Sequence, residues 1–520
     1  MTQVILVIIA LCAIAGCAPK SGSRVPDGES RTPESGPMSS PEEYGDRPIS
    51  AEAGADYFLR LGGGDPYATG MAYPLFLALM EAYPGELGRD WNAFAEKFGM
   101  ISDPEAKGDP RVLPIGFHLT VDPKTNVPWL VANCQFCHAE RIRLPGGDRI
   151  VPGMGNKSVR PHAYGAALVR IGTDPGLDPA RLTALATQRA AAWNVAWPEV
   201  MRRPIVDATL AAFKSGSARR AAWAKQVDDA LPGRTATIES FAFALGERQN
   251  QTIVLPSTIG WVKTPDVRGF PFRETFSYDA SGYGSPQALV LEADFLFGTR
   301  AEWYLSHPHI ATSMYLYLKS FTRKLPFPKP VDEALARRGK GVFEARCAEC
   351  HGFYVDHGDD VRVSYRERVI PLDVIGTDPA RVKAVTADFV EAANRFEMTR
   401  GYTRVRNTNG YVPPVLIDVW ARGVFGHAGQ WPSLEAMATR PDERPRQFIV
   451  DTRGLYDLER VGVRHEIVPR GRPARPLKPG EYLYNGDLPG FRTDGHPFLS
   501  NLPPADRLAT IEYLKTLSAD

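Results

Sequence analysis

The 520-residue chain has few cysteines, almost no net charge and no long apolar run. Only six cysteines are present, and four of them form two CxxC pairs. The other two, Cys12 and Cys17, lie near the N-terminus, so no cysteine remains for a structural disulfide. The formal net charge is +1, which gives no electrostatic footprint for nucleic acid. We therefore expect no nucleic-acid partner.

The N-terminal apolar run, Val4–Ala15, is too short to span a bilayer and is placed like the central region of a signal peptide. It leads into Ile14–Cys17, which resembles the lipobox of bacterial lipoproteins, where the cysteine becomes the acylated first residue. We predict a lipoprotein signal peptide at 1–17 with acylated Cys17. An uncleaved anchor is the alternative, because the first three residues carry no Lys or Arg. Either reading predicts a periplasm-facing protein on a bacterial membrane, and the lack of aspartate after Cys17 favours the outer membrane.

The rest of the chain is predicted to form a tether and two domains. Residues 18–50 are rich in Ser, Pro, Gly and charge, a composition that cannot bury a core. The remaining length suits two domains. A helix predicted over 310–321 is followed by the Pro-rich stretch Leu325–Pro330. We therefore expect an N-terminal domain at 51–325 and a C-terminal domain at 326–520.

A histidine directly follows each CxxC pair. The two motifs consist of Cys134, Cys137 and His138, and of Cys347, Cys350 and His351. This pattern is the signature of covalent c-type haem attachment, because two thiols add to the vinyl groups of one haem and the adjacent imidazole reaches the iron. A thiol redox pair and a zinc site are the alternatives, but one four-cysteine zinc site would leave the two histidines unexplained. We predict two haems c, with His138 and His351 as axial ligands.

The pattern around the motifs is mostly helical. Apolar and small residues recur at helical spacing between Val331 and the second motif, as they do in 57–100, in 182–230 and in a final amphipathic stretch over 506–517. Residues 250–300 are instead short aromatic pieces punctuated by Pro and Gly, which indicates loops and a few strands. The predicted fold class is mainly α, with two cytochrome c-like haem domains and irregular loop-rich insertions.

These motifs and their surroundings resemble the dihaem superfamily of bacterial cytochrome c peroxidases and the methylamine-utilisation dihaem enzyme. Within it, the chain is most similar to the dihaem rubber oxygenases, the relatives of the latex-clearing cytochrome. The matching pieces are Asn133–His138, Gly341–His351, Pro413–Leu434, Arg444–Gly462 and Gly495–Leu517. Matches are sparse between 160 and 330.

The resemblance points to a sixth ligand for the second iron. His496 stands just before the final helix, where these families place the distal ligand of the C-terminal haem. Histidine there lowers the reduction potential relative to methionine. His427 is the rival ligand, although it matches a position that supports the site without binding iron. The remaining alternative for His496 is an ordinary surface histidine in a Gly-Pro loop.

The first iron has a weaker candidate. Met154 follows His138 by sixteen residues, where bacterial peroxidases carry a histidine that caps the peroxidatic haem. Methionine could bind the iron weakly or line the distal pocket of an open iron. Trp261 is the candidate electron relay between the haems, with Trp303 and Trp420 as competitors. The distal acid or base is left open among Glu140, Glu292 and Asp294.

The predicted function is that of a dihaem c-type cytochrome oxidoreductase. It would activate dioxygen or peroxide at the N-terminal haem and use the C-terminal haem as electron relay, as an oxygenase or peroxidase does. Its partners would be this small oxidant and an electron donor or organic substrate that the sequence does not identify. A pure electron-transfer cytochrome with two six-coordinate irons is the main alternative, and a haem-based sensor is a third class.

Overall fold

The computed structural model describes most of the chain after residue 43. The described residues are 44–45, 47–66, 70–102, 112–214, 217–227, 230–285, 301–321, 325–357, 360–396, 403–469, 473 and 475–517. Cys17, its leader and nearly all of the predicted tether lie outside this range, as do Glu292 and Asp294.

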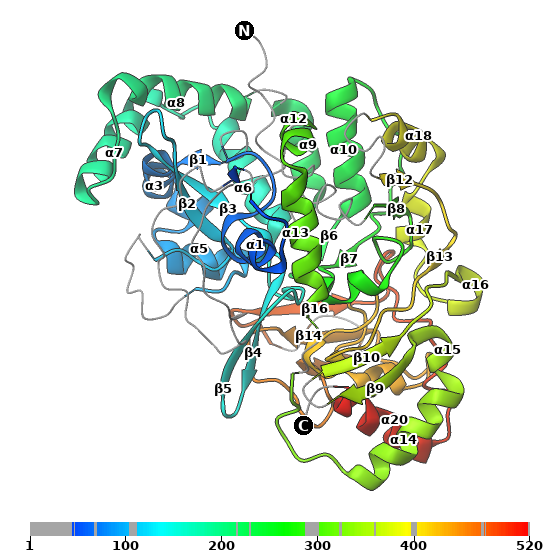
Figure 1. The fold of residues 1–520 in the computed structure, drawn as a ribbon. Helices are drawn as coiled ribbons and strands as arrows, with labels where there is room; N and C mark the ends of the chain where they lie inside the picture. Colours follow the sequence, from blue (N-terminus) through cyan, green and yellow to red (C-terminus); the bar gives the residue numbers. More distant parts are fainter. Residues whose placement is uncertain are drawn as a thin grey trace. The chain divides into compact units, whose positions relative to one another are not determined.

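The chain forms two compact units that are both discontinuous in sequence (Figure 1). Unit 1 comprises Met1–Ala139, Val159–Ala230 and Gln287–Tyr317. Unit 2 comprises Glu140–Ser158, Leu231–Pro286 and Leu318–Asp520. The stretch 51–325, predicted as one N-terminal domain, thus contains two whole segments of unit 2 and the start of its third.

The prediction of a mainly α fold is wrong. Helices account for 43% of the residues and strands for 15%, and the strands form several small sheets, so the fold is mixed α/β. Many of these strands have only two or three residues and pair with distant segments, as β8 (Gly282–Gly284) does with β12 (Thr403–Val405). Strands this short show no alternating pattern of their own, which is why the sequence did not reveal them.

In the described part of unit 1, helices combine with a three-stranded antiparallel sheet of order β1-β3-β2. Its helices are α1 (Ala51–Asp56), the π-helical turn η2 (Tyr57–Leu61), α3 (Tyr73–Ala82), α4 (Pro84–Leu87), α5 (Trp91–Phe98), α6 (Pro161–Thr173), α7 (Pro179–Ala192), α8 (Glu199–Lys214), α9 (Ser217–Val227), α12 (Ala301–Ser306) and α13 (Pro308–Lys319). Its strands are β1 (Met71–Ala72), β2 (Phe117–Val121) and β3 (Pro128–Ala132).

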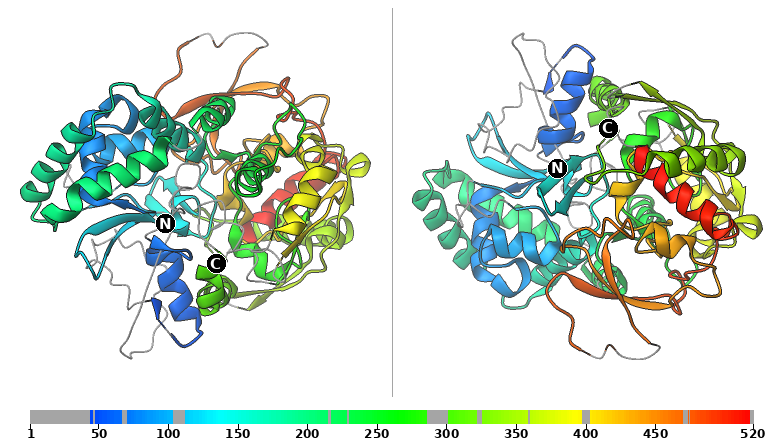
Figure 2. Two further views of the ribbon diagram at one scale, coloured as in Figure 1. Left: turned by 90° about the horizontal axis from the view of Figure 1, so that it is seen from above. Right: turned by 90° about the horizontal axis from the view of Figure 1, so that it is seen from below.

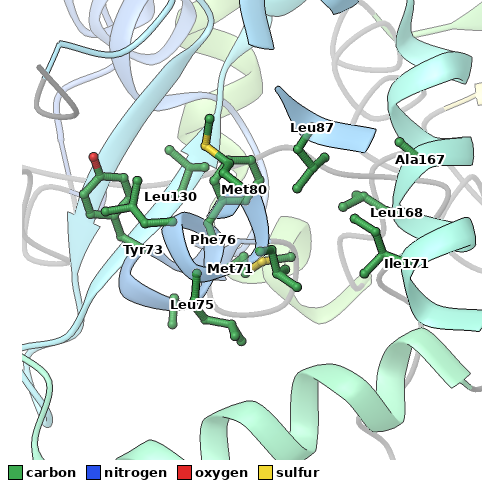
Figure 3. Close-up of a cluster of buried hydrophobic side chains, with 14 of the residues drawn as sticks. Met71, Tyr73, Leu75, Phe76, Met80, Leu87, Leu130, Ala167, Leu168 and Ile171 are labelled. Carbon is green, nitrogen blue, oxygen red and sulfur yellow. The ribbon is translucent and has the colours of Figure 1, made fainter. Parts of the chain in front are cut away.

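The main core of unit 1 is built around α3. Every residue from Tyr73 to Met80 is buried, which is typical of a helix that is apolar all round and packed on several sides. Phe76 and Met80 of α3 lie in one cluster with Leu130 of β3 and Leu168 of α6 (Figure 3). This core holds the sheet and the helices of unit 1 together.

Unit 2 contains more strands. Its helices are α10 (Thr237–Gln249), α14 (Glu333–Arg346), α15 (Ala348–His351), α16 (Leu372–Ile375), α17 (Ala380–Ala384), α18 (Ala387–Arg395), α19 (Leu434–Ala438) and α20 (Pro504–Thr516), with 3₁₀ turns η5 (Val267–Phe272) and η6 (Val419–Arg422). Its strands include the sheet β15-β14-β16, made of β14 (Gln447–Asp451), β15 (Arg464–Ile467) and β16 (Glu481–Asn485).

Among the described residues, unit 2 also contains five two-stranded ladders. They pair β4 (Ala139–Leu144) with β5 (Gly147–Pro152), β6 (Arg234–Thr235) with β7 (Val262–Lys263), β9 (Phe353–His357) with β10 (Asp360–Ser364), β11 (Ile370–Pro371) with β13 (Gly410–Tyr411), and β8 with β12. Helices α14 and α20 lie against each other (Figure 2) and close over a core that contains Phe343, Trp420 and Tyr513. No helix among the described residues is long and apolar enough to cross a membrane.

Candidate functional site

The second CxxCH motif directly follows α14. The Asp332 side chain accepts a hydrogen bond from the Leu335 backbone N–H and caps the start of this helix. The helix ends at Arg346, and the motif forms the short turn α15. In this turn the His351 N–H donates to the Cys347 carbonyl oxygen over 3.0 Å. The backbone thus fixes the histidine relative to the cysteines.

The His351 ring is oriented for metal binding. Its Nδ1 lies 2.9 Å from the carbonyl oxygen of Pro414. A carbonyl oxygen only accepts, so Nδ1 carries the proton and Nε2 keeps its lone pair. A backbone carbonyl that fixes the tautomer in this way is a common support for metal-binding histidines.

The His496 ring lies opposite His351. The two ring centroids are 6.2 Å apart and the ring planes are inclined by 56°. With metal–nitrogen bonds of about 2 Å on each side, two imidazoles on one iron have centroids roughly 6 Å apart. Each imidazole can rotate about its iron–nitrogen bond, so two rings on one iron can have any angle between their planes. The inclination of 56° is therefore compatible with both histidines binding one iron.

The protonation state of His496 also suits a ligand. Burial, with the nearby Arg444 charge and the cost of protonating His496 beside His351, lowers the pKa of His496 to about 3, so the ring is neutral near pH 7. Its Nδ1 is buried and has no hydrogen-bond partner among the described residues. A buried polar atom without a partner is uncommon in a native structure and is accounted for by an absent ligand or water. The residues of unit 2 therefore fit a haem iron between His351 and His496.

The rival ligand His427 is engaged elsewhere. Its ring stacks on Tyr411, with centroids 4.5 Å apart, and its Nε2 lies 3.3 Å from the Tyr411 hydroxyl oxygen. That hydroxyl donates to the carbonyl oxygen of Asp378. Burial lowers the pKa of His427 to about 3. Of the two histidines, His496 is the one that faces His351.

Cys137 and Cys347 do not have the lowered pKa of a reactive redox thiol. Burial raises the pKa of Cys137 to about 12 and that of Cys347 to about 11. Reactive CxxC thiols have a lowered pKa instead, because the thiolate is the attacking species. Within the described residues, no group of three or more His, Cys, Asp or Glu is gathered to hold a metal ion.

The first motif, in unit 1, is attached to a helix that is distant in sequence. Asn133 caps the short turn η4 (Cys134–Phe136) by accepting from the Gln135 N–H. The Asn133 amide donates to the carbonyl oxygens of Leu59 and Arg60, and the Gln135 amide donates to that of Leu59. Side-chain hydrogen bonds thus join the first motif to the end of η2. The second motif, by contrast, follows α14 directly in the chain.

A pair of crossing helices lies next to each motif, and the two pairs are built alike. In unit 1, α1 crosses α13 at Gly54, and a Cβ on Gly54 would overlap the carbonyl oxygen of Ser313. In unit 2, α14 crosses α20 at Gly339, and a Cβ there would overlap the carbonyl oxygen of Ala509. Figure 2 shows each pair side by side. Both crossings need glycine because the two backbones touch.

An aromatic pair repeats next to each crossing. Phe58 follows Gly54 by four residues and contacts Tyr317, with ring centroids 5.5 Å apart and planes inclined by 54°. Phe343 follows Gly339 by four residues and contacts Tyr513, at 5.3 Å and 57°. Tyr317 likewise follows Ser313, the residue in contact with Gly54, by four positions. Tyr513 follows Ala509, the residue in contact with Gly339, by four positions. Residues four apart lie on one helix face, so the two helix pairs have the same register.

Met154 is part of the core of unit 2. It is 1% exposed and packs in the cluster that contains Phe343 and Trp420. It also lines a small cavity with Lys157, Lys263, Asp266 and Arg422 among its walls. His138 belongs to unit 1. Ligation of the first iron by Met154 stays a prediction.

The remaining candidates have defined partners. Glu140 is buried and forms an ion pair of 2.6 Å with Lys157. Trp261 lies in unit 2, where its ring stacks on Phe491 at 6.2 Å. Trp303 lies in unit 1, and Trp420 is fully buried with its indole N–H donating to the Leu325 carbonyl oxygen. The relay role of Trp261 stays a prediction.

Sequence reasoning missed the paired glycines and aromatics. The spacing Gly-x₃-Phe occurs at 54–58 and again at 339–343, and its partners are Ser-x₃-Tyr at 313–317 and Ala-x₃-Tyr at 509–513. Aligning the regions before the two CxxCH motifs could not reveal this repeat. The first copy is separated from its motif by the intervening elements β1 to β3, whereas the second adjoins its motif.

The comparisons with known proteins do not identify a family. No family model matches the chain. It is similar to two proteins of Sinorhizobium fredii, the uncharacterized protein y4iJ, 25% identical over 239 residues, and the uncharacterized protein y4iM, 29% identical over 199 residues. These matches cover 36% and 33% of this chain, and 39% and 42% of the two relatives. The chain therefore spans about two fifths of the length of these relatives.

Proposed function

We propose that this chain is a dihaem c-type cytochrome oxidoreductase that carries one haem c on each CxxCH motif. The observation that carries the proposal is the helix pair of common register beside each motif. Two unrelated CxxCH sequences would have no reason to share a glycine crossing and a Phe–Tyr contact at the same spacing. The similarity to the dihaem peroxidases and rubber oxygenases, noted in the sequence, supports the same class.

In unit 2, two histidines would hold the iron from both sides. His351 keeps its Nε2 free because its Nδ1–H is engaged by the Pro414 carbonyl oxygen. The neutral ring of His496 faces it at the spacing of a shared iron. Two nitrogen ligands leave no open position, and this geometry suits an electron relay of low potential.

In unit 1, His138 would supply one axial ligand, and the sixth position decides the reaction. A haem supplies one-electron chemistry and, where a coordination position is open, binding of dioxygen or peroxide. The contribution of the chain is to attach the group through Cys134 and Cys137 and to present His138 to it. We propose the catalytic reading, with a small oxidant and an electron donor or organic substrate as partners. Electron transfer alone is the competing function. The two functions differ only in whether the sixth coordination position of this first iron is open or occupied.

The same proposal places the protein outside the cytoplasm, where haem c is attached. Lipid attachment at Cys17 would hold it at a bacterial membrane facing the periplasm, the outer membrane in our proposal. This part of the proposal is supported only by the lipobox-like sequence that ends at Cys17.

Haem counting tests the proposal. Pyridine haemochrome analysis should find two covalently bound haems per chain. The double variant Cys134→Ala/Cys137→Ala should lose one, and the matched variant Cys347→Ala/Cys350→Ala should lose the other together with the low-spin bis-histidine spectrum. A protein with one haem, or with zinc, contradicts the proposal.

Ligand binding then separates catalyst from carrier. We expect one haem that ignores cyanide and carbon monoxide and one that binds them. Two low-spin haems that both refuse these ligands would leave electron transfer as the function.

A further inference from the structure

The loop that carries His496 is held by one buried arginine. Arg444 is 3% exposed, and its five hydrogen bonds within the described residues all end on backbone carbonyl oxygens. The acceptors are Thr493, Gly495 and His496 in the loop, and Met437 and Thr439 at the end of α19. The guanidinium therefore ties three of the four residues in 493–496 to a separate helix.

The loop needs this support because its backbone is strained. His496 has φ of +46°, in the left-handed region that only glycine adopts without cost, and Gly495 before it has φ of +85°. A strained non-glycine residue persists only where its surroundings hold it. Besides Arg444, the carbonyl oxygen of Ile375 accepts from the His496 N–H over 2.7 Å.

A tryptophan completes the clamp. The Arg444 guanidinium carbon lies 4.8 Å from the ring centroid of Trp431, and the Trp431 indole N–H donates to the Thr493 carbonyl oxygen over 3.0 Å. Asp494, the carboxylate within the loop, forms ion pairs with Arg446 and Arg492. The Arg444 charge is thus shared among carbonyl dipoles and an indole face, which fixes its position through geometry.

We infer that Arg444 is a positioning residue that holds His496 in place as the sixth ligand of the iron bound by His351. The inference rests on the proposed function. Arg444 does not touch the iron itself. Its planar fork grips the carbonyl oxygens of Thr493, Gly495 and His496 and so keeps the ring of His496 facing His351. Lysine has the charge but not the fork, so it cannot replace arginine here.

Spectroscopy of the second haem tests this role. Arg444→Met and Arg444→Lys should both raise the population of the His496-free iron by on the order of tenfold or more, because several charge-assisted hydrogen bonds are lost. Electron paramagnetic resonance should show new high-spin signal from this haem, and carbon monoxide should bind to it. Added imidazole should restore the low-spin spectrum. Rescue by imidazole shows that the haem and His351 are intact and that only the sixth ligand was lost.

Two further variants sharpen the test. Arg446→Met is the matched control, since Arg446 pairs with Asp494 and makes no hydrogen bond to the His496 backbone, and it should leave the spin state unchanged. In the background of His496→Ala, Arg444→Met should produce no additional high-spin signal, because the ligand that it positions is already gone. An additive effect in that background contradicts the inference.

The outcomes separate this inference from the proposed function. If haem analysis finds no second haem on the wild-type protein, the proposed function fails. If two haems are present and Arg444→Met keeps a fully low-spin second haem, only the role of Arg444 is refuted.

Discussion

The contact between α14 and α20 leads to a prediction that two variants of one helix can test. Gly339 faces the backbone of α20, where an added Cβ would overlap the Ala509 carbonyl oxygen. Gly341 lies two residues further along α14 and has nothing within 4 Å of an added Cβ. Gly339→Ala should therefore destabilise unit 2, whereas Gly341→Ala should stabilise it.

The magnitudes follow from two terms. Both substitutions gain about 1 kcal/mol of helix propensity, because alanine replaces glycine inside a helix. Gly339→Ala also forces two backbones apart, and overpacking of this kind costs about 1–3 kcal/mol or more. The propensity gain is common to both variants. Their difference in unfolding free energy should therefore equal the overpacking cost, about 1–3 kcal/mol.

Denaturant unfolding followed at the Soret band of the proposed second haem measures this difference. A chain with two units need not unfold in one step, so the quantity to compare is the midpoint of the transition that releases the bis-histidine spectrum. The midpoint should fall for Gly339→Ala and rise slightly for Gly341→Ala. Equal midpoints for the two variants would refute the tight crossing and, with it, the matched register of the two helix pairs.

Three further predictions concern other parts of the chain. Cys17→Ser should abolish incorporation of labelled fatty acid and release the protein into the soluble periplasmic fraction, and continued labelling would refute the lipobox. Met154→Ala should leave the second haem unchanged and either have no effect or ease cyanide binding at the first; an effect confined to the second haem would contradict the assignment. Burial lowers the pKa of His427 from 6.5 to about 3, so the unfolded chain binds one more proton between these values and stability falls as pH falls through them. His427→Gln should flatten this acid destabilisation by up to about 1.4 kcal/mol per pH unit, measured by denaturant titration across pH 4 to 6.

Three of the helices next to the two motifs could be predicted because their signals are local. A helix leading into Cys347, a helix over 310–321 and a final helix over 506–517 are confirmed as α14, α13 and α20, within a few residues at each end. Each has apolar residues at helical spacing over at least three turns, so neighbouring residues alone indicate the helix. The two CxxCH motifs could be recognised for the same reason, because each consists of five consecutive residues.

The sheets and the supports of the site could not be predicted. Strand β8 finds its partner β12 more than a hundred residues away, and neither is long enough to alternate visibly. The Pro414 carbonyl oxygen and the Arg444 side chain act on His351 and His496 only after folding has brought them together. A single sequence shows residue types and local spacing, and such long-range contacts leave no trace in either.

The interleaving of the two units has a consequence for the order of folding. The first motif is synthesised early, but the helix that crosses α1 is α13, so this pair cannot close until residue 319 has been made. Unit 2 begins with Glu140–Ser158 and ends with α20. Its early segments therefore cannot complete their packing until the last helix of the chain has been made. Contacts this distant in sequence make folding slow. Both pairs of thiols therefore stay on an open chain until late in synthesis, and on the proposed function they would be accessible for haem attachment.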